Sequence, residues 1–156
     1  MNAPNDEQYT RYSVFSISGK LFGLELSTVR EVIPQPKITS LPNVPTHVLG
    51  VYNLRGSIIA LVDIQQILGL KLTEKRETDV ILLVEFSKFL ASFIVEQVLD
   101  FVEVENSKIQ LPSTDIPTRL AHYVRGLYNA NNMGQIILLE TERLLNSNRL
   151  FIRDDG

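Results

Sequence analysis

Two histidines carry the side chains in this sequence that are best suited to proton transfer at neutral pH. His47 and His122 could form a general acid-base pair if the fold brought them within hydrogen-bond reach. Each one precedes its own copy of a repeated segment, however, and no serine elbow, phosphate-binding loop or metal-ligand spacing accompanies them. The chain has no cysteine, which excludes a catalytic thiol and thiolate metal sites. The residues therefore predict no catalytic, cofactor-binding or metal-binding site and no enzyme activity, and a small-barrel enzyme stays a weaker alternative.

Asp63 offers a second kind of chemistry, because an aspartate that ends an apolar strand is similar to the phosphoacceptor of a receiver domain. A receiver also needs helices of about ten residues or more between parallel strands, and the sequence lacks that pattern. Instead, Gln66 stands at the capping-box position and Gly69 follows the apolar run. We therefore predict a short helix over 64–68 with Asp63 as its N-cap, and a receiver-like phosphoacceptor stays the weaker alternative.

A repeat underlies the whole chain. Gly50-Val51-Tyr52-Asn53 matches Gly126-Leu127-Tyr128-Asn129 at a spacing of 76 positions (126 − 50). Apolar residues upstream recur at a spacing of 69 positions, as in Val29 and Val98 (98 − 29). The second copy therefore carries a longer connection before its glycine, which a surface loop tolerates at low cost.

The polar segment 71–79 separates the two copies and has no apolar periodicity. We predict a single domain over residues 10–150, made of two subdomains at about 10–72 and 78–150 whose chain ends could cross over. Residues 1–9 and 151–156 are predicted to be flexible tails.

Period-two alternation of apolar residues, bounded by turn residues, predicts four hairpins. The predicted strand pairs are 13–18 with 20–26, 48–54 with 57–62, 79–87 with 89–95, and 123–129 with 135–140. About five short strands in each half favour two small closed barrels. Barrels of this size should share an apolar interface, and the groove between them is the expected binding site.

Helical periodicity is confined to short stretches. Spacing at i, i+3 and i+4 predicts one helical turn in each half, and a purely structural interpretation places the first-half residues and Val98 in the core. These residues are Val29, Val32 and Ile33 in the first half and Val98, Phe101 and Val102 in the second. Another short helix is predicted from Thr141 through Leu144 and Leu145.

Charge and hydropathy limit the classes of partner. The net charge is −3 at pH 7, and a nucleic-acid surface would normally be basic. No run approaches the roughly 18 apolar residues that span a bilayer, and residues 1–7 lack the basic and apolar regions of a secretion signal. We expect a soluble cytoplasmic protein with no nucleic-acid partner and no direct membrane insertion.

The segment LGVYNLRGSIIALVD at 49–63 resembles the signature of the CheW family of chemotaxis coupling proteins. The resemblance extends over roughly residues 10–150. It implies an all-β fold of two five-stranded SH3-like barrels with short helices, and no enzymatic activity. It also implies two partners, the cytoplasmic hairpin tips of chemoreceptors and the regulatory domain of a CheA-type histidine kinase, with recruitment to membrane receptor arrays. A scaffold of a pilus-motility or other non-flagellar chemosensory pathway is the alternative within the family.

The resemblance also marks residues in or beside the receptor-binding groove and its Arg-Gly turn. Short aliphatic side chains suit the apolar ridges of a coiled-coil hairpin, and Arg55 suits a rim contact with carboxylate or carbonyl oxygens. The marked residues are Val29, Glu31, Val32, Gly50, Val51, Asn53, Arg55 and Gly56.

Some of these residues also have a purely structural interpretation. Arg55-Gly56 could be an ordinary solvated hairpin turn, and Gly50 could permit a close strand crossing, as Gly126 would in the second copy. The second copy continues with Ala130-Asn131-Asn132 where the first has Leu-Arg-Gly, so only the first half carries the signature.

Overall fold

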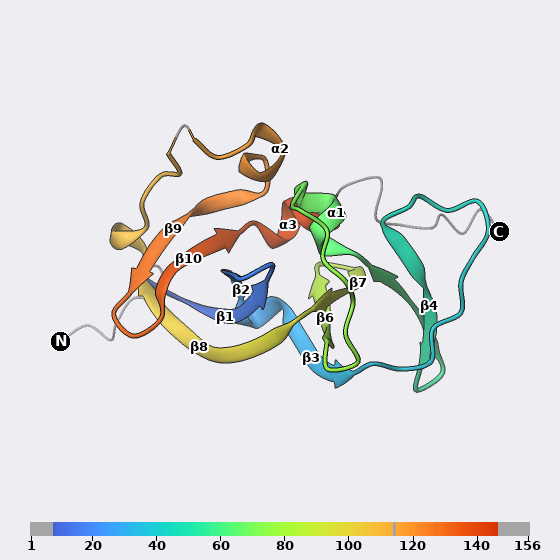
Figure 1. The fold of residues 1–156 in the computed structure, drawn as a ribbon. Helices are drawn as coiled ribbons and strands as arrows, with labels where there is room; N and C mark the ends of the chain where they lie inside the picture. Colours follow the sequence, from blue (N-terminus) through green and yellow to red (C-terminus); the bar gives the residue numbers. More distant parts are fainter. Residues whose placement is uncertain (1–7, 114, 147–156) are drawn as a thin grey trace.

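Ten strands form two five-stranded sheets in the computed structural model, which describes residues 8–113 and 115–146 (Figure 1). The sheet orders are β8-β1-β2-β10-β9 and β3-β6-β7-β5-β4. The first sheet contains β1 (Tyr9–Ile17), β2 (Lys20–Glu25), β8 (Gln97–Glu105), β9 (Val124–Ala130) and β10 (Gly134–Leu139). The second contains β3 (Val29–Pro34), β4 (Val48–Leu54), β5 (Ser57–Val62), β6 (Val80–Phe86) and β7 (Phe89–Val95). The predicted all-β class with two five-stranded units is confirmed.

All four predicted hairpins are present, with boundaries that differ by one to four residues or agree fully. The largest difference is at β1, which begins at Tyr9. Tyr9 therefore belongs to a strand and not to the predicted flexible tail. The tail residues 1–7 and 151–156 lie outside the described part of the chain.

The two sheets do not follow the two halves of the sequence. β1 and β2 from the first half join β8, β9 and β10 from the second, while β6 and β7 join β3, β4 and β5. Two parallel pairings complete this exchange, β2 with β10 and β5 with β7. Each sheet therefore requires strands from both halves, and its limits do not coincide with the ranges 10–72 and 78–150.

Three apolar clusters fill the structure, one inside each sheet's own barrel and one between the two. The cluster of the first sheet includes Tyr12 and Val14, and that of the second includes Tyr52 and Ile59. The largest cluster takes Phe15 and Phe22 from the first sheet and Leu82, Val84 and Phe93 from the second. Neighbouring residues of one strand thus enter different clusters, because successive side chains point to opposite faces. The two barrels share a continuous apolar interface.

The helical turn predicted at 29–33 is wrong, because this segment is strand β3. A bulge lies between Val29 and Glu31, where the pairing with β6 shifts by one residue. The extra residue changes the side-chain alternation, so Val29 and Val32 face the same side of the sheet although they are three positions apart.

The turn predicted at 98–102 is wrong for the same reason. This segment belongs to β8, whose pairing with β1 also shifts, so that Val98 lies opposite Phe15 and Phe101 lies opposite Ser13. A bulge in a strand therefore reproduced the i, i+3 spacing of a helix in both halves.

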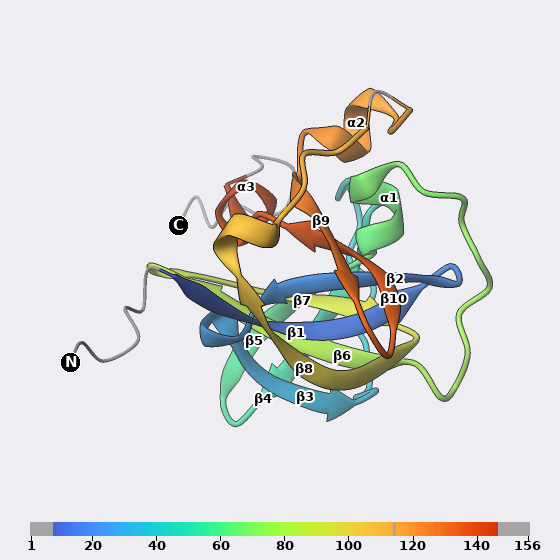
Figure 2. The same cartoon turned by 90° about the vertical axis from the view of Figure 1, so that its left-hand side faces the viewer.

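The short helices cover one side of the molecule (Figures 1 and 2). They are α1 (Ile64–Leu68), α2 (Thr118–Ala121) and α3 (Thr141–Leu145), and single 3₁₀ turns lie at Leu26–Thr28 and Asn106–Lys108. The predicted N-cap is confirmed, because the Asp63 carboxylate accepts the Gln65 N–H at 3.0 Å. Gly69 has a φ of 72°, as expected of a residue that ends a helix in the left-handed conformation. No helix within 8–113 and 115–146 is long and apolar enough to cross a membrane.

The segment that joins the two sequence halves is bound to the body of the protein. The buried Gln65 amide donates to Ser18 Oγ at 2.9 Å and to Thr73 Oγ1 at 2.7 Å. Lys75 pairs with the buried Asp63 at 3.1 Å. The connection between the halves is therefore part of the packed structure.

We propose that residues 10–150 unfold as one unit, because each sheet needs strands from both halves and the largest apolar cluster lies between them. Differential scanning calorimetry should give a single transition whose calorimetric and van't Hoff enthalpies agree. Two resolved transitions would contradict this proposal and would indicate barrels that fold independently.

Candidate functional site

An ion pair joins two residues that the sequence singled out, Glu31 on β3 and Arg55 in the turn between β4 and β5. Arg55 donates to both carboxylate oxygens of Glu31, with Nη1 to Oε1 at 3.2 Å and Nη2 to Oε2 at 2.5 Å. This two-pronged geometry is the strongest arrangement available to an arginine and a carboxylate. β3 and β4 are the two outermost strands of their sheet, so the ion pair connects its opposite edges.

The turn that presents Arg55 is formed by local interactions. Arg55 and Gly56 have φ angles of 50° and 89°, the pattern of a type I′ hairpin turn. The Asn53 Oδ1 accepts the Gly56 N–H at 3.0 Å. The signature residues Asn53 and Gly56 therefore hold the arginine in place, and the Arg55 side chain is 69% exposed.

The ion pair changes the acidity of both of its members. The hydrogen bond from Arg55 lowers the pKa of Glu31, and the carboxylate raises the pKa of Arg55. The pKa of Glu31 is therefore lower in the folded protein than in the unfolded chain. The ion pair is fully formed at a pH above the pKa that Glu31 has in the unfolded chain, and it is lost as the pH falls through the pKa of Glu31 in the folded protein. At neutral pH the site therefore presents a complete, mutually neutralising charge pair.

A second part of the site lies where the two barrels meet. Val32 lies opposite Leu82, which belongs to the shared cluster. Phe101 lies opposite Ser13, which faces the same side of β1 as Phe15, another member of that cluster. Val32 and Phe101 therefore both point toward the side of their sheet that forms the shared cluster. Val32 is nevertheless 45% exposed and Phe101 is 49% exposed. These two residues are apolar side chains at the margin of the inter-barrel interface.

The floor of this margin is formed by Val29 and Val98, which are half-buried and pack against the shared cluster. Figures 1 and 2 both show β3 and β8 side by side, on the side of the molecule away from the helices. We call Val29, Val32, Val98 and Phe101 the inter-barrel margin. The sequence predicted Val29 and Val32 as site residues. It did not single out Phe101, which it assigned only to a helical turn because the bulge in β8 gave this residue a helical spacing.

Gly50 and Val51 have a structural role in the described fold. Val51 exchanges two backbone hydrogen bonds with Thr39, at 2.8 and 2.9 Å. A Cβ at Gly50 would lie 2.4 Å from the Thr39 carbonyl oxygen, which no side chain tolerates. The second copy repeats this crossing, since Leu127 pairs with Gln110 and a Cβ at Gly126 would lie 2.3 Å from Ile109. Gly50 is buried and lies within the crossing of two backbone segments, as its structural interpretation expects.

One exposed residue beside the Arg-Gly turn was not singled out from the sequence. Ile58 is 66% exposed and lies directly across from Asn53 in the β4–β5 hairpin. Its signal in the sequence is a large aliphatic residue at an outward position of a strand, where a polar residue is usual.

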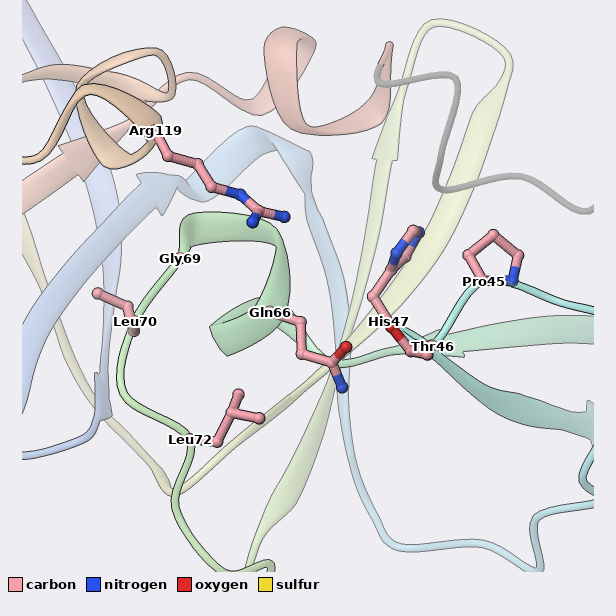
Figure 3. Close-up of a pocket in the computed structure, with 8 residues that line it drawn as sticks. All are labelled: Pro45, Thr46, His47, Gln66, Gly69, Leu70, Leu72 and Arg119. Atoms are coloured by element: carbon pink, nitrogen blue, oxygen red, sulfur yellow. The ribbon is translucent and has the colours of Figure 1, made fainter.

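The residues considered for chemistry occupy structural positions. The Asp63 carboxylate caps α1 and pairs with Lys75, and His122 packs edge to face on Tyr123 with ring centroids 4.9 Å apart. His47 is buried in the wall of a pocket beside α1 (Figure 3). No group of three or more His, Cys, Asp or Glu side chains that could hold a metal ion occurs among residues 8–113 and 115–146.

Comparison with known proteins gives consistent results. A family model described as a CheW-like domain matches residues 11–149. The chemotaxis protein CheW of Klebsiella aerogenes is 25% identical over 92% of this chain and 86% of its own length. The protein PilI of Pseudomonas aeruginosa is 31% identical over 74% of this chain and 65% of its own. The crystal structure of the scaffolding protein TtCheW from Thermoanaerobacter tengcongensis superposes with a TM-score of 0.78 at 28% identity, covering 92% of this chain and 97% of that one.

Proposed function

Because this chain belongs to the CheW family, we propose that it is a non-catalytic adaptor that couples the cytoplasmic tips of chemoreceptors to a CheA-type histidine kinase. The observation that carries this proposal is the similarity of the whole fold, two SH3-like barrels, to a scaffolding protein of the family. An adaptor needs two binding surfaces and no reactive centre. It works in the cytoplasm and is recruited to receptor arrays at the membrane.

The receptor surface that we propose consists of the inter-barrel margin and the neighbouring ion pair. Receptor tips are helical hairpins, and such hairpins present apolar ridges with polar flanks. Val32 and Phe101 offer exposed apolar area for a ridge. Glu31, which precedes Val32 on the edge strand β3 and points to the other face of that strand, offers with Arg55 a pair of charges at the same edge. Asn53 and Gly56 contribute by fixing the turn, and Gly50 and Val51 by fixing the strand behind it.

The kinase surface lies elsewhere, on exposed barrel loops and strand edges. This separation lets one adaptor hold receptor and kinase at the same time. To pass on a receptor's state, it must bind the active and inactive arrangements of the kinase with different free energies.

A role in pilus-based motility is a second candidate, favoured by the similarity to PilI. Deleting the gene for this protein would distinguish the flagellar role from the pilus role. Loss of directed swimming with normal twitching supports the flagellar role, and the reverse supports the pilus role.

This protein can be titrated calorimetrically with the regulatory domain of the CheA-type kinase from the same organism. We expect saturable one-to-one binding with a Kd of roughly tens of micromolar or tighter, which is the range of transient signalling partners. The variant Arg55→Glu should bind the kinase domain equally well, because Arg55 belongs to the receptor surface. Absence of binding by the wild type would refute the kinase coupling.

A further inference from the structure

The outer face of the first barrel continues the inter-barrel margin along β1 and β8. Tyr12 of β1 points into the barrel's own apolar cluster, so its neighbours Arg11 and Ser13 point outward. Phe101 of β8 lies opposite Ser13, and Glu103 lies opposite Arg11. From the margin outward, this face therefore presents an aromatic ring and then an arginine beside a glutamate.

Arg11 contacts both of these residues of β8. Its guanidinium carbon lies over the Phe101 ring, 5.8 Å from the ring centre, which is within the range of a cation–π interaction. Its Nε lies 3.5 Å from Glu103 Oε2. The two contacts place the guanidinium next to the ring, while the Arg11 side chain stays 62% exposed. Arg11 is therefore positioned beside the apolar area of the margin and is open to a partner.

Arg55 on the second barrel and Arg11 on the first differ in the donors that they still have to offer. Arg55 directs both of its terminal nitrogens, Nη1 and Nη2, to Glu31. Arg11 meets Glu103 only through Nε, and its Nη1 and Nη2 make no hydrogen bond or ion pair within residues 8–113 and 115–146. The donors of a guanidinium match the two oxygens of a carboxylate. Arg11 can therefore receive a carboxylate from a partner without giving up Glu103.

The spacing between Phe101 and Arg11 suits a helix as the partner. A helix advances about 5.4 Å in each turn, close to the 5.8 Å between the Arg11 guanidinium and the Phe101 ring. When an apolar residue of a helix packs on Phe101, the residue three or four positions away comes to lie over Arg11. An acidic residue at that position would meet the Nη donors. The surface therefore fits an amphipathic helix with a carboxylate one turn from its apolar ridge.

We propose that Arg11 determines specificity at the receptor surface by binding a carboxylate of the receptor hairpin, one helical turn from the apolar side chain that packs on Phe101. This proposal rests on the receptor role proposed above and extends that surface from the margin onto β1. A receptor with a basic residue at the same position is disfavoured, because two like charges would meet at the interface.

Two neutral variants separate binding of a partner from the internal ion pair. The full-length protein is co-sedimented with membranes that contain a chemoreceptor of the same organism. Arg11→Gln should lower the affinity about tenfold, as expected for loss of one charge-assisted contact. Glu103→Gln should leave the affinity unchanged or raise it, because it removes a competing carboxylate and keeps the guanidinium. Equal losses in both variants would overturn the proposal, since Arg11 would then act only through its pair with Glu103.

Arg143→Gln is the matched control. It removes the same charge from α3, on the helical side of the molecule, and should bind receptor membranes as the wild type does (Figure 2). If the wild type and Arg11→Gln bind equally well, this proposal fails and the receptor role stands. If the wild type itself does not sediment with receptor membranes, the receptor role fails and this proposal fails with it.

A charge exchange identifies the partner residue. Each acidic residue of the receptor tip is changed in turn to lysine, and every variant is tested against wild-type protein and against Arg11→Glu. One receptor variant should bind Arg11→Glu at least about tenfold more tightly than it binds the wild type, because the exchange restores an attractive pair. The absence of such a variant would overturn the proposal.

Discussion

Replacing Gly50 by alanine is expected to destabilise the protein severely. The added Cβ would lie 2.4 Å from the Thr39 carbonyl oxygen and 2.7 Å from Ile38 Cγ2, and the φ angle of 151° is one that side chains rarely adopt. Crowding of this kind costs about 1–3 kcal/mol, and backbone strain costs about the same. The sum of about 2–6 kcal/mol is a large fraction of the roughly 5–15 kcal/mol that stabilises a typical domain.

Two other glycines separate these causes. Gly126 has the same crowding without a positive φ, and Gly134 has a φ of 88° with no atom within 4 Å of an added Cβ. Guanidinium chloride unfolding should therefore rank the alanine variants with Gly50 most destabilised, Gly126 next and Gly134 least. A Gly50→Ala protein of normal stability that no longer binds receptors would refute the structural role and make Gly50 a contact residue.

Reversing the charge of Arg55 is expected to abolish assembly with receptors while the protein stays folded. Arg55→Glu places two carboxylates where the ion pair was, so the surface beside the inter-barrel margin changes from neutral to doubly negative. Stability should change little, because exposed ion pairs contribute little to folding. Co-sedimentation with receptor-containing membranes should fall at least about tenfold, the effect of losing one charged contact at an interface.

The double variant Glu31→Arg with Arg55→Glu makes this test specific. It restores an ion pair of opposite orientation, so any small loss of melting temperature should be recovered, but receptor assembly should not return. Asn131→Glu is the matched control, because Asn131 occupies the same place in the second repeat and is exposed. The opposite outcome would be a large loss of stability in Arg55→Glu, with both stability and receptor assembly restored in the double variant. That outcome would show that the ion pair acts only by closing the barrel.

The sequence was sufficient for local structure. Strand alternation and turn glycines located all four hairpins, and the Asp63, Gln66 and Gly69 pattern located α1 together with its cap. These features depend on residues within a few positions of one another, so their signals lie in short windows. The repeat and the segment at 49–63 were also enough to identify the family and the class of fold.

The helical spacing at 29–33 and 98–102 misled the prediction because the cause was not local. A bulge forms when one strand has an extra residue relative to its partner, and the partners of β3 and β8 are β6 and β1. Nothing within either segment distinguishes this spacing from one turn of a helix. The error also concealed Phe101 as a site residue, although it lies exposed at the inter-barrel margin.

The sequence by itself determined which strands form hairpins, where the signature turn lies and which family the chain joins. Only the tertiary structure decided that the halves exchange their first two strands, that Glu31 bonds to Arg55, and that Val32 and Phe101 lie at the margin of a shared interface. Each of these depends on pairing between segments far apart in the chain, such as β2 with β10 and β5 with β7. Such pairings are selected by the packing of whole faces against each other, and a single strand's sequence does not encode its distant neighbour.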